Sequence, residues 1–120
     1  MGIKKFVYSL YETSLLNKLE KNDLPKHIGL IHDGHRRYAR EKGLLSYEVS
    51  YRIGINTFKE CLSWCSNLNI NHITSWLLSK ENLNRPKEEL IPYYKVLEEL
   101  FKDFTTSDTF DDYKIRFVGS

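Results

Sequence analysis

Cysteine and long apolar runs are scarce in this sequence of 120 residues, and both shortages exclude classes of protein. Cys61 and Cys65 belong to no Cys-x-x-Cys pair, so we expect reduced thiols rather than a structural zinc site. No apolar run approaches the ~20 residues that cross a bilayer, and the N-terminus lacks the apolar core and cleavage site of a signal peptide. We therefore expect a single-domain cytoplasmic protein.

An excess of charge of one sign is also lacking, since 18 Lys and Arg residues oppose 16 Asp and Glu residues. That balance argues against nucleic acid as a partner. Four basic residues nevertheless gather in a short stretch, namely Arg36, Arg37, Arg40 and Lys42. Such a cluster is either the solvated face of a helix or part of an anion site, and the neighbouring acid Asp33 favours the anion site.

The rest of the chain is organised around residues 27–43. Apolar residues 28–31 predict a buried strand, which stops at Asp33-Gly34, where a segment of helical character rich in arginine begins. An acid at the end of a parallel strand can hold a diphosphate and a divalent cation together with the N–H groups and arginines of the following helix. We expect the active site here.

Residues 1–24 have the spacing of an amphipathic helix. Two interpretations remain open. The helix either packs on its own domain or lies on a membrane surface, with Lys4, Lys5 and Lys18 near the phospholipid head groups.

A strand–helix–strand unit is predicted for the middle of the chain. The spacing of apolar residues predicts a helix over 47–68, in which Trp64 is expected in the core and Gly54 permits a close approach. Residues 72–78 predict a second strand, parallel to the first. The carboxyl ends of the two strands then meet at one edge, which brings Asp33 near residues 79–86.

A further helix follows Pro86, with a broad apolar face. The residues expected on this face are Leu90, Ile91, Tyr94, Leu97, Leu100, Phe101 and Phe104. The face belongs either to the core or to the wall of a tunnel for a long apolar ligand. Residues 113–118 alternate between polar and apolar side chains and predict a third strand.

Two segments together resemble the signatures of a known family. Residues 27–40 read His-Ile-Gly-Leu-Ile-His-Asp-Gly-His-Arg-Arg-Tyr-Ala-Arg, and residues 79–89 read Ser-Lys-Glu-Asn-Leu-Asn-Arg-Pro-Lys-Glu-Glu. They are similar to the Met-Asp-Gly-Asn-Arg-Arg-Tyr/Phe-Ala and Ser-x-Glu-Asn-Trp-x-Arg-Pro motifs of the cis-prenyltransferases, which include undecaprenyl and dehydrodolichyl diphosphate synthases. The order and separation of the motifs also match, and the similarity extends from about Leu24 to Gly119.

The resemblance implies a parallel sheet flanked by helices and a Mg²⁺-dependent condensation of an allylic prenyl diphosphate with isopentenyl diphosphate, which forms a cis double bond. It implies that Asp33 is the essential acid, acting through the metal and the diphosphate, and that Asn82 takes part in proton handling. The residues that it assigns to the substrate site are Gly34, His35, Arg36, Arg37, Tyr38, Ser79, Lys80, Glu81 and Arg85.

Several residues depart from the family pattern. They are His32 for the common Met, His35 for Asn, Leu83 for Trp, and Tyr51 for the His of Gly-His-x-x-Gly. The arginine expected slightly before Tyr51 is also missing. Arg40 or Arg52 could replace the phosphate contacts that are lost.

Members of this family are much longer, and the part absent here holds the Arg-x-x-x-Arg-x-Ser motif for isopentenyl diphosphate and a glutamate that helps to hold Mg²⁺. We therefore expect residues 25–120 to form the N-terminal half of a cis-prenyltransferase-like α/β domain, incomplete as a single chain. It would act with a second subunit or within a longer chain. A non-catalytic partner subunit is the main alternative, and an unfinished sheet also predicts self-association.

A metallophosphoesterase is a further alternative, since Asp33 and His35 fit the Asp-x-His opening of such enzymes. The later metal-ligand motifs of that class are absent.

Overall fold

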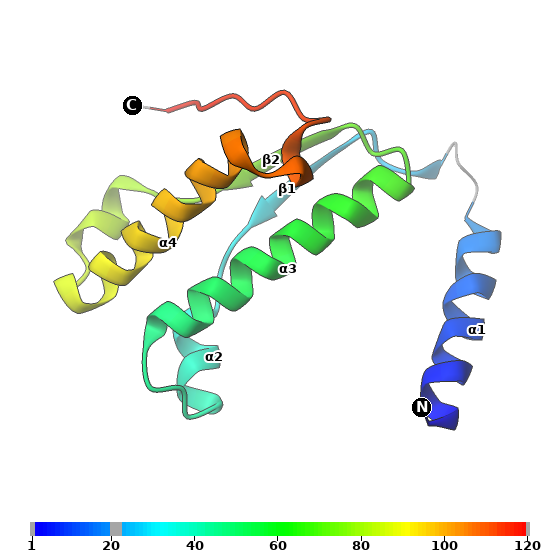
Figure 1. Ribbon diagram of the computed structural model, residues 1–120, viewed down its shortest axis with the longest axis horizontal. Coiled ribbons are helices and arrows are strands. Elements are labelled where there is room, and N and C mark those ends of the chain that lie inside the picture. Colours follow the sequence, from blue (N-terminus) through cyan, green and yellow to red (C-terminus); the bar gives the residue numbers. More distant parts are fainter. Residues whose placement is uncertain (1, 20–22, 120) are drawn as a thin grey trace.

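The computed structural model describes residues 2–19 and 23–119. Its elements are α1 (Ile3–Lys18), β1 (His27–Ile31), α2 (His35–Glu41), α3 (Tyr47–Asn67), β2 (His72–Trp76), the 3₁₀ helix η2 (Lys80–Asn84), α4 (Lys87–Thr106) and the 3₁₀ helix η3 (Asp108–Phe110) (Figure 1). This is an α/β fold, as predicted. None of the described helices is long and apolar enough to span a bilayer.

The two strands form a parallel sheet in which His27 pairs with His72 and Ile31 pairs with Trp76. Helix α3 connects them, so the predicted strand–helix–strand unit is confirmed. Because a crossover connection returns the chain to the same end of the sheet, both strands point the same way. The segments that follow β1 and β2 therefore start at one edge.

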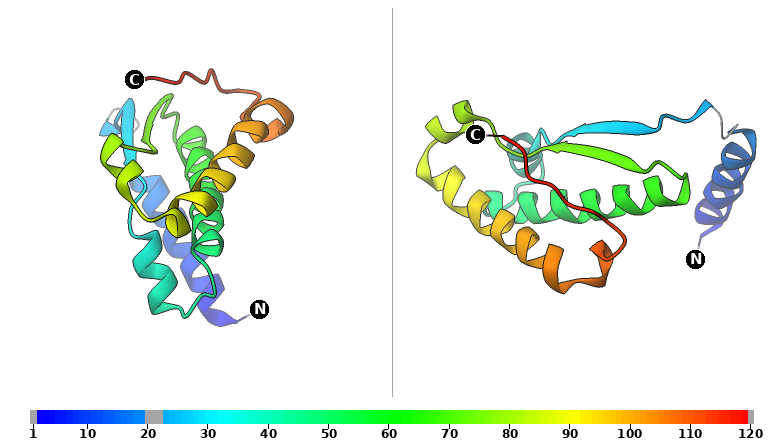
Figure 2. Two further views of the ribbon diagram at one scale, coloured as in Figure 1. Left: turned by 90° about the vertical axis from the view of Figure 1, so that its left-hand side faces the viewer. Right: turned by 90° about the horizontal axis from the view of Figure 1, so that it is seen from above.

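The core lies on one side of the sheet, which α3 and α4 cover (Figure 2). We call this the inner side. The buried cluster on it consists of Phe58, Leu62, Leu97, Leu100 and Phe110. Leu30 and Ile73, the inward residues of the strands, pack against this cluster. Apolar burial between the sheet and the helix pair thus holds the elements together.

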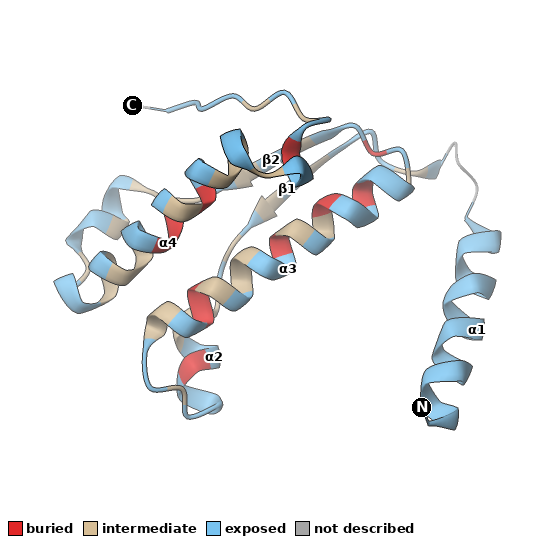
Figure 3. Ribbon diagram, viewed as in Figure 1, coloured by how far each residue is buried: buried red, intermediate tan, exposed pale blue. Residues whose placement is uncertain are grey.

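The other side of the sheet, the outer side, is bare. Exposed and partly buried residues alternate along both strands, and Ile31 and Trp76 are 81% and 61% exposed. Figure 3 shows that buried residues gather on the helices instead. The prediction that residues 28–31 form a fully buried strand is therefore wrong for the outer side, because the described helices that cover the sheet lie on the inner side.

Helix α3 follows the predicted bounds closely and buries Tyr51, Phe58 and Leu62 toward the rest of the fold. Trp64, expected in the core, is instead 55% exposed. Successive residues of an α-helix are about 100° apart around the axis, so Trp64 projects from the side opposite to Leu62.

Helix α4 contributes Leu97 and Leu100 to the core, which confirms the core interpretation for these two residues. Ile91 and Tyr94, expected on the same face, are 64% and 42% exposed. That part of the prediction is wrong because Tyr93, four residues before Leu97, is the tyrosine that packs against the core cluster.

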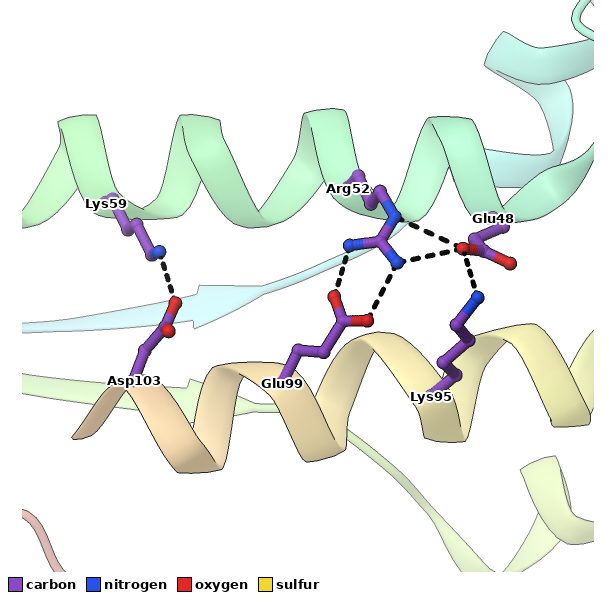
Figure 4. A network of polar contacts seen from close by, with 6 residues as sticks. All are labelled: Glu48, Arg52, Lys59, Lys95, Glu99 and Asp103. Atoms are coloured by element: carbon purple, nitrogen blue, oxygen red, sulfur yellow. Dashed lines mark hydrogen bonds and ion pairs between the residues drawn. The ribbon is translucent and has the colours of Figure 1, made fainter. Parts of the chain in front are cut away.

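Ion pairs join α3 to α4 along their exposed margin (Figure 4). The Arg52 guanidinium donates to the Glu99 carboxylate and to Oε1 of Glu48. Lys95 donates to the same Oε1 at 3.0 Å. A second bridge, between Lys59 and Asp103, measures 2.6 Å. These contacts link the exposed margins of the two helices beside the core.

Residues 113–118 form no strand within the described chain, so the predicted third strand is wrong. Tyr113 and Ile115 pack against the core cluster, and the Tyr113 hydroxyl donates to the Leu62 carbonyl at 3.0 Å. Phe117 and Val118 are exposed. The alternation of polar and apolar residues along this segment therefore reflects which side chains face the core, and it does not indicate a strand paired with another.

Helix α1 has no buried residue and lies away from the sheet and the other helices (Figure 1). The expectation that it packs on its own domain is not met in this structure. Phe6, Leu10 and Tyr11 are each more than half exposed. The helix therefore presents an apolar surface without a cover among the described residues.

Candidate active site

The turn after β1 presents a carboxylate at the edge of the sheet. Gly34 has φ +88°, the left-handed region that glycine adopts without strain, and it lets the chain turn directly into α2. The Gly34 N–H donates to the Asp33 carboxylate at 2.6 Å. Asp33 is exposed, so its second oxygen is open to a ligand.

The segment after β2 starts with a reciprocal cap. The Ser79 hydroxyl accepts a hydrogen bond from the Asn82 backbone N–H at 3.2 Å, and the Asn82 side-chain oxygen accepts one from the Ser79 N–H at 3.0 Å. Such a capping box satisfies two backbone donors and fixes the loop. The Asn82 amide NH₂ stays available to a ligand, while its oxygen is already engaged.

A chain of three rings connects the two segments. His35 of α2 meets Tyr51 of α3 edge-to-face with ring centroids 5.7 Å apart, and Tyr51 meets Tyr93 of α4 at 5.1 Å. The Tyr93 hydroxyl donates to the carbonyl oxygen of Leu77, two residues before Ser79. The rings thereby link the loop of Asp33 to the loop of Ser79.

Gly54 makes room for this arrangement. A Cβ atom at residue 54 would lie 2.2 Å from Cε1 of His35, closer than any real contact. Glycine in a helix interior costs about 1 kcal/mol relative to alanine. The expected close approach at Gly54 is therefore found, and the group that approaches is the His35 imidazole.

Charged groups surround the rings. Arg36 of α2 donates to Glu89 of α4 at 3.0 Å, which holds the start of α4 beside α2. Burial raises the pKa of the Tyr51 hydroxyl; Glu89 raises it further, whereas Arg85 and Arg36 oppose the rise. Burial likewise raises the pKa of Tyr93, and Arg85 again opposes it. The positive charge of Arg85 thus acts against the rise in pKa at both tyrosines.

Two histidines beside Asp33 favour the neutral form. The pKa of His32 is lowered by burial and by His35, and the pKa of His35 is lowered by burial, an effect that Asp33 partly opposes. His32 Nε2 is buried and has no hydrogen-bond partner among the described residues. It lines a pocket of about 10 Å³ with the three rings. That volume is about the minimum that holds one water molecule.

The remaining predicted site residues do not line this pocket. Arg37, Tyr38, Lys80 and Glu81 are exposed. Arg52, considered as a substitute phosphate ligand, is engaged with Glu48 and Glu99 in the α3–α4 network instead.

Arg40, the other candidate, lines a separate open hollow of about 420 Å³ with Leu45, Tyr47 and Glu88. Neither arginine therefore stands in the ring-lined pocket beside Asp33.

Sequence reasoning missed Tyr93 and Glu89. The signal for Tyr93 is its position four residues before Leu97 on the inward face of α4. Glu89 lies in the first turn of α4, and only the fold shows that it meets Arg36. The described residues bring no three His, Cys, Asp or Glu side chains together as a metal cage.

Comparison with known proteins agrees with these motifs. Residues 31–120 match the family described as "Putative undecaprenyl diphosphate synthase". A tritrans,polycis-undecaprenyl-diphosphate synthase (geranylgeranyl-diphosphate specific) of Methanopyrus kandleri is 42% identical over 117 residues, which are 96% of this chain and 43% of the relative. A (2Z,6E)-farnesyl diphosphate synthase of Thermobifida fusca is 41% identical over 99 residues, 82% of this chain and 39% of the relative. An isoprenyl transferase of Thermus thermophilus is 32% identical over 123 residues, 99% of this chain and 46% of the relative.

The chain thus spans less than half the length of each of these relatives. The matched residues include the Asp33 turn, the three rings and the Ser79 loop. The resemblance that the two motifs indicate is therefore confirmed. This chain belongs to the undecaprenyl diphosphate synthase family of cis-prenyltransferases.

Proposed function

We propose that this chain supplies the allylic diphosphate site of a cis-prenyltransferase, and that a second chain supplies the site for isopentenyl diphosphate. The observation that carries the proposal is the meeting of two candidate anion-binding segments at one edge of the sheet. The Asp33 turn and the Ser79 loop follow paired parallel strands, and the three rings join them.

The residues divide into ligands and positioning groups. Arg37 and Arg85 form no ion pair with the described residues and supply positive charge to a diphosphate. Ser79 and Asn82 supply a hydroxyl hydrogen and amide hydrogens from a loop that the capping box has already ordered. Arg36 is paired with Glu89, so its role is to position α2 against α4.

Five further residues complete the proposed substrate site at its margin. They are Gly34, His35, Tyr38, Lys80 and Glu81. His35 is held by Gly54 and Tyr51, whereas Tyr38 and Lys80 lie exposed where a flexible diphosphate can reach them.

Asp33 fits a Mg²⁺ ion that is held mainly by the substrate. Magnesium keeps several waters and is commonly bound by one or two carboxylates together with substrate phosphates, so one exposed carboxylate is a sufficient protein contribution. When bound, the ion neutralises charge that develops on the departing diphosphate. Arg37 and Arg85 stabilise the same charge from the protein side.

The second site is proposed to come from a second chain or from further residues of a longer chain. Condensation requires two diphosphates side by side, and this edge holds a single cluster of candidate anion ligands. The relatives are more than twice as long as their matched part, so they contain further residues for a second site. A partner of this family would provide the equivalent residues.

One observation favours a non-catalytic subunit as the alternative. The pocket behind Asp33 measures only about 10 Å³ because His35, Tyr51 and Tyr93 fill it. An allylic hydrocarbon chain needs far more space. In the catalytic proposal the hydrocarbon must therefore run along a surface that the partner completes.

A binding experiment on the chain alone tests the first half of the proposal. Isothermal titration of a non-hydrolysable farnesyl diphosphate analogue with Mg²⁺ should show binding that weakens at least tenfold in Asp33→Asn, because the carboxylate is removed. Asp112→Asn, an exposed acid beyond η3, is the matched control and should bind normally. Equal binding by all three proteins would remove Asp33 from the site.

A transfer assay tests the second half. Labelled isopentenyl diphosphate and farnesyl or geranylgeranyl diphosphate are incubated with Mg²⁺ and this chain, with and without a co-purified partner. We expect product only with the partner and none with Asp33→Ala. Normal activity of an Asp33→Ala complex would identify the chain as the non-catalytic subunit.

We also propose that α1 contacts a membrane surface. It presents Phe6, Leu10 and Tyr11 to solvent beside Lys4 and Lys5, a combination that binds anionic head groups. Co-sedimentation with phosphatidylglycerol vesicles should fall when both lysines are changed to glutamate. Unchanged sedimentation would assign the apolar face of α1 to a protein partner instead.

A further inference from the structure

The two cysteines of the chain form a pair on α3. Cys61 and Cys65 are four residues apart in this helix (Tyr47–Asn67), so they lie on the same side of it, one turn apart. Both are free thiols. Cys65 is 4% exposed, and Cys61 is partly buried. One cysteine therefore lies inside the fold and the other lies at its margin.

The pair has apolar neighbours and is suited to stay reduced. The buried residues Phe58, Leu62 and Cys65 follow the side of α3 that turns toward the core (Figure 3). Burial raises the pKa of the Cys65 thiol, and Cys61 raises it further. Because the thiolate is the form that oxidants attack, a thiol with a raised pKa reacts with them more slowly.

The spacing of the two cysteines does not suit a disulfide. Residues four apart on a helix have Cβ atoms about 5–6 Å apart, whereas a disulfide joins Cβ atoms about 3.5–4.5 Å apart. Residues Tyr47–Asn67 form one α-helix, which a disulfide between Cys61 and Cys65 would distort. An ion between the two sulfurs adds a further bond to the bridge, so it spans the longer distance on an undistorted helix.

The number and softness of the ligands indicate which kind of ion fits. Zinc in structural sites takes four ligands in a tetrahedron. Thiolates select soft ions such as Cu(I), which is stable with only two thiolates arranged in a line. Such an ion therefore needs no ligand beyond Cys61 and Cys65.

We propose that Cys61 and Cys65 bind one soft monovalent cation, represented by Cu(I), between their two sulfur atoms. The ion enters at Cys61, the more exposed residue, and becomes enclosed beside Cys65. Two S–H protons pass to solvent, two S–Cu bonds form and no electron is transferred, so the site gains one negative charge. Cys61 lies seven residues beyond Gly54, about 10 Å along α3, so this inference does not depend on the proposed function.

Anaerobic titration tests the site. The reduced full chain competes for Cu(I) with the colorimetric chelator bicinchoninate. We expect one Cu(I) per chain, and at least tenfold weaker binding in Cys61→Ser and in Cys65→Ser, because each variant keeps a single thiolate. Cys65→Ala is a second variant for the buried position, where a serine hydroxyl would be hard to satisfy. Far-ultraviolet circular dichroism establishes that each variant is folded. Unchanged binding in the Cys61 variant or in both Cys65 variants overturns the proposal.

A shifted pair is the matched control. Cys65→Ser combined with Ser66→Cys keeps two thiols but places them five residues apart, about 140° apart around the helix axis. Ser66 is exposed, so the new thiol is accessible. This variant should bind Cu(I) at least tenfold more weakly than the unchanged chain. Equal affinity would mean that any two thiols suffice, which contradicts a site defined by one side of α3.

X-ray absorption identifies the ligands directly. The Cu(I) complex of the unchanged chain should show two sulfur neighbours around the copper ion. Nitrogen neighbours in place of sulfur would assign the ion to histidines such as His27 and His72, and the proposal would then be wrong. Neither result bears on the diphosphate site, which the Asp33-dependent binding of the diphosphate analogue tests separately.

Discussion

Apolar residues lie on both sides of the small sheet, but their surroundings are opposite. On the inner side, Leu30 and Ile73 pack under two helices, and Leu100 above them is 1% exposed. On the outer side, Ile31 is 81% exposed. Apolar sequence alone therefore does not determine burial, which also requires an element to pack against. The predictions below test whether stability resides on the inner side.

The largest effect is expected in the core. Leu100→Ala should lower the free energy of unfolding by about 2–5 kcal/mol, because it removes buried methyl groups and leaves a cavity. Urea denaturation of the isolated chain measures the change. Ile31→Ala is the control on the outer side and should stay within about 0.5 kcal/mol. Similar losses for both residues would contradict the difference between the two sides.

Gly54→Ala should have the next largest effect. Its Cβ would displace the His35 ring from Tyr51, and overpacking of this kind costs about 1–3 kcal/mol. In a His35→Ala background the same substitution should stabilise the chain by about 0.5–1 kcal/mol, since alanine is the better helix former. Urea denaturation of the unchanged chain, the two single variants and the double variant gives the effect of Gly54→Ala with and without the His35 ring.

The sign of the Gly54 effect is the decisive result. If Gly54→Ala stabilises the chain even with His35 present, the imidazole does not occupy the space beside α3. The link between α2 and the rest of the site would then be looser than the structure indicates.

Tyr93→Phe should cost about 1 kcal/mol, the usual value of one hydrogen bond, because it removes the donor to the Leu77 carbonyl. Tyr94→Phe is the matched control, since Tyr94 is exposed and should tolerate loss of its hydroxyl. Thermal unfolding measures both. Equal effects would mean that the Tyr93 hydroxyl does not support the loop before Ser79.

The sequence predicts the halves of the site better than their connection. The position of Asp33 relative to the Ser79 loop follows from two strands joined by one helix, because parallel strands end at the same edge. To predict the three-ring link, one must know which face of α4 points inward. The broad apolar stripe of this helix predicts that Tyr94 faces inward, whereas Tyr93 does so in the structure. A stripe that covers much of a helix does not fix its rotation.

The other wrong predictions share a different cause. The apolar run of β1 and the alternation of residues 113–118 both describe side chains suited to burial. Whether a neighbouring strand or helix exists to bury them depends on elements elsewhere in the fold. The outer side of the sheet and the unpaired end segment are therefore the places where local pattern and structure differ.

The smallest effect is expected at the exposed ion pairs between α3 and α4. Arg52→Gln removes the bonds to Glu48 and Glu99, but these groups lie in water, where attraction is weak. The melting temperature should fall slightly at low salt and not at all near 1 M salt, where charges are screened beyond ~3 Å. Arg40→Gln, an exposed residue without an ion pair in the described chain, controls for loss of charge. A fall in melting temperature that persists at high salt would show that the Arg52 side chain stabilises the helix pair by packing. The exposed margin of α3 and α4 would then contribute to the stability of the inner side together with the core.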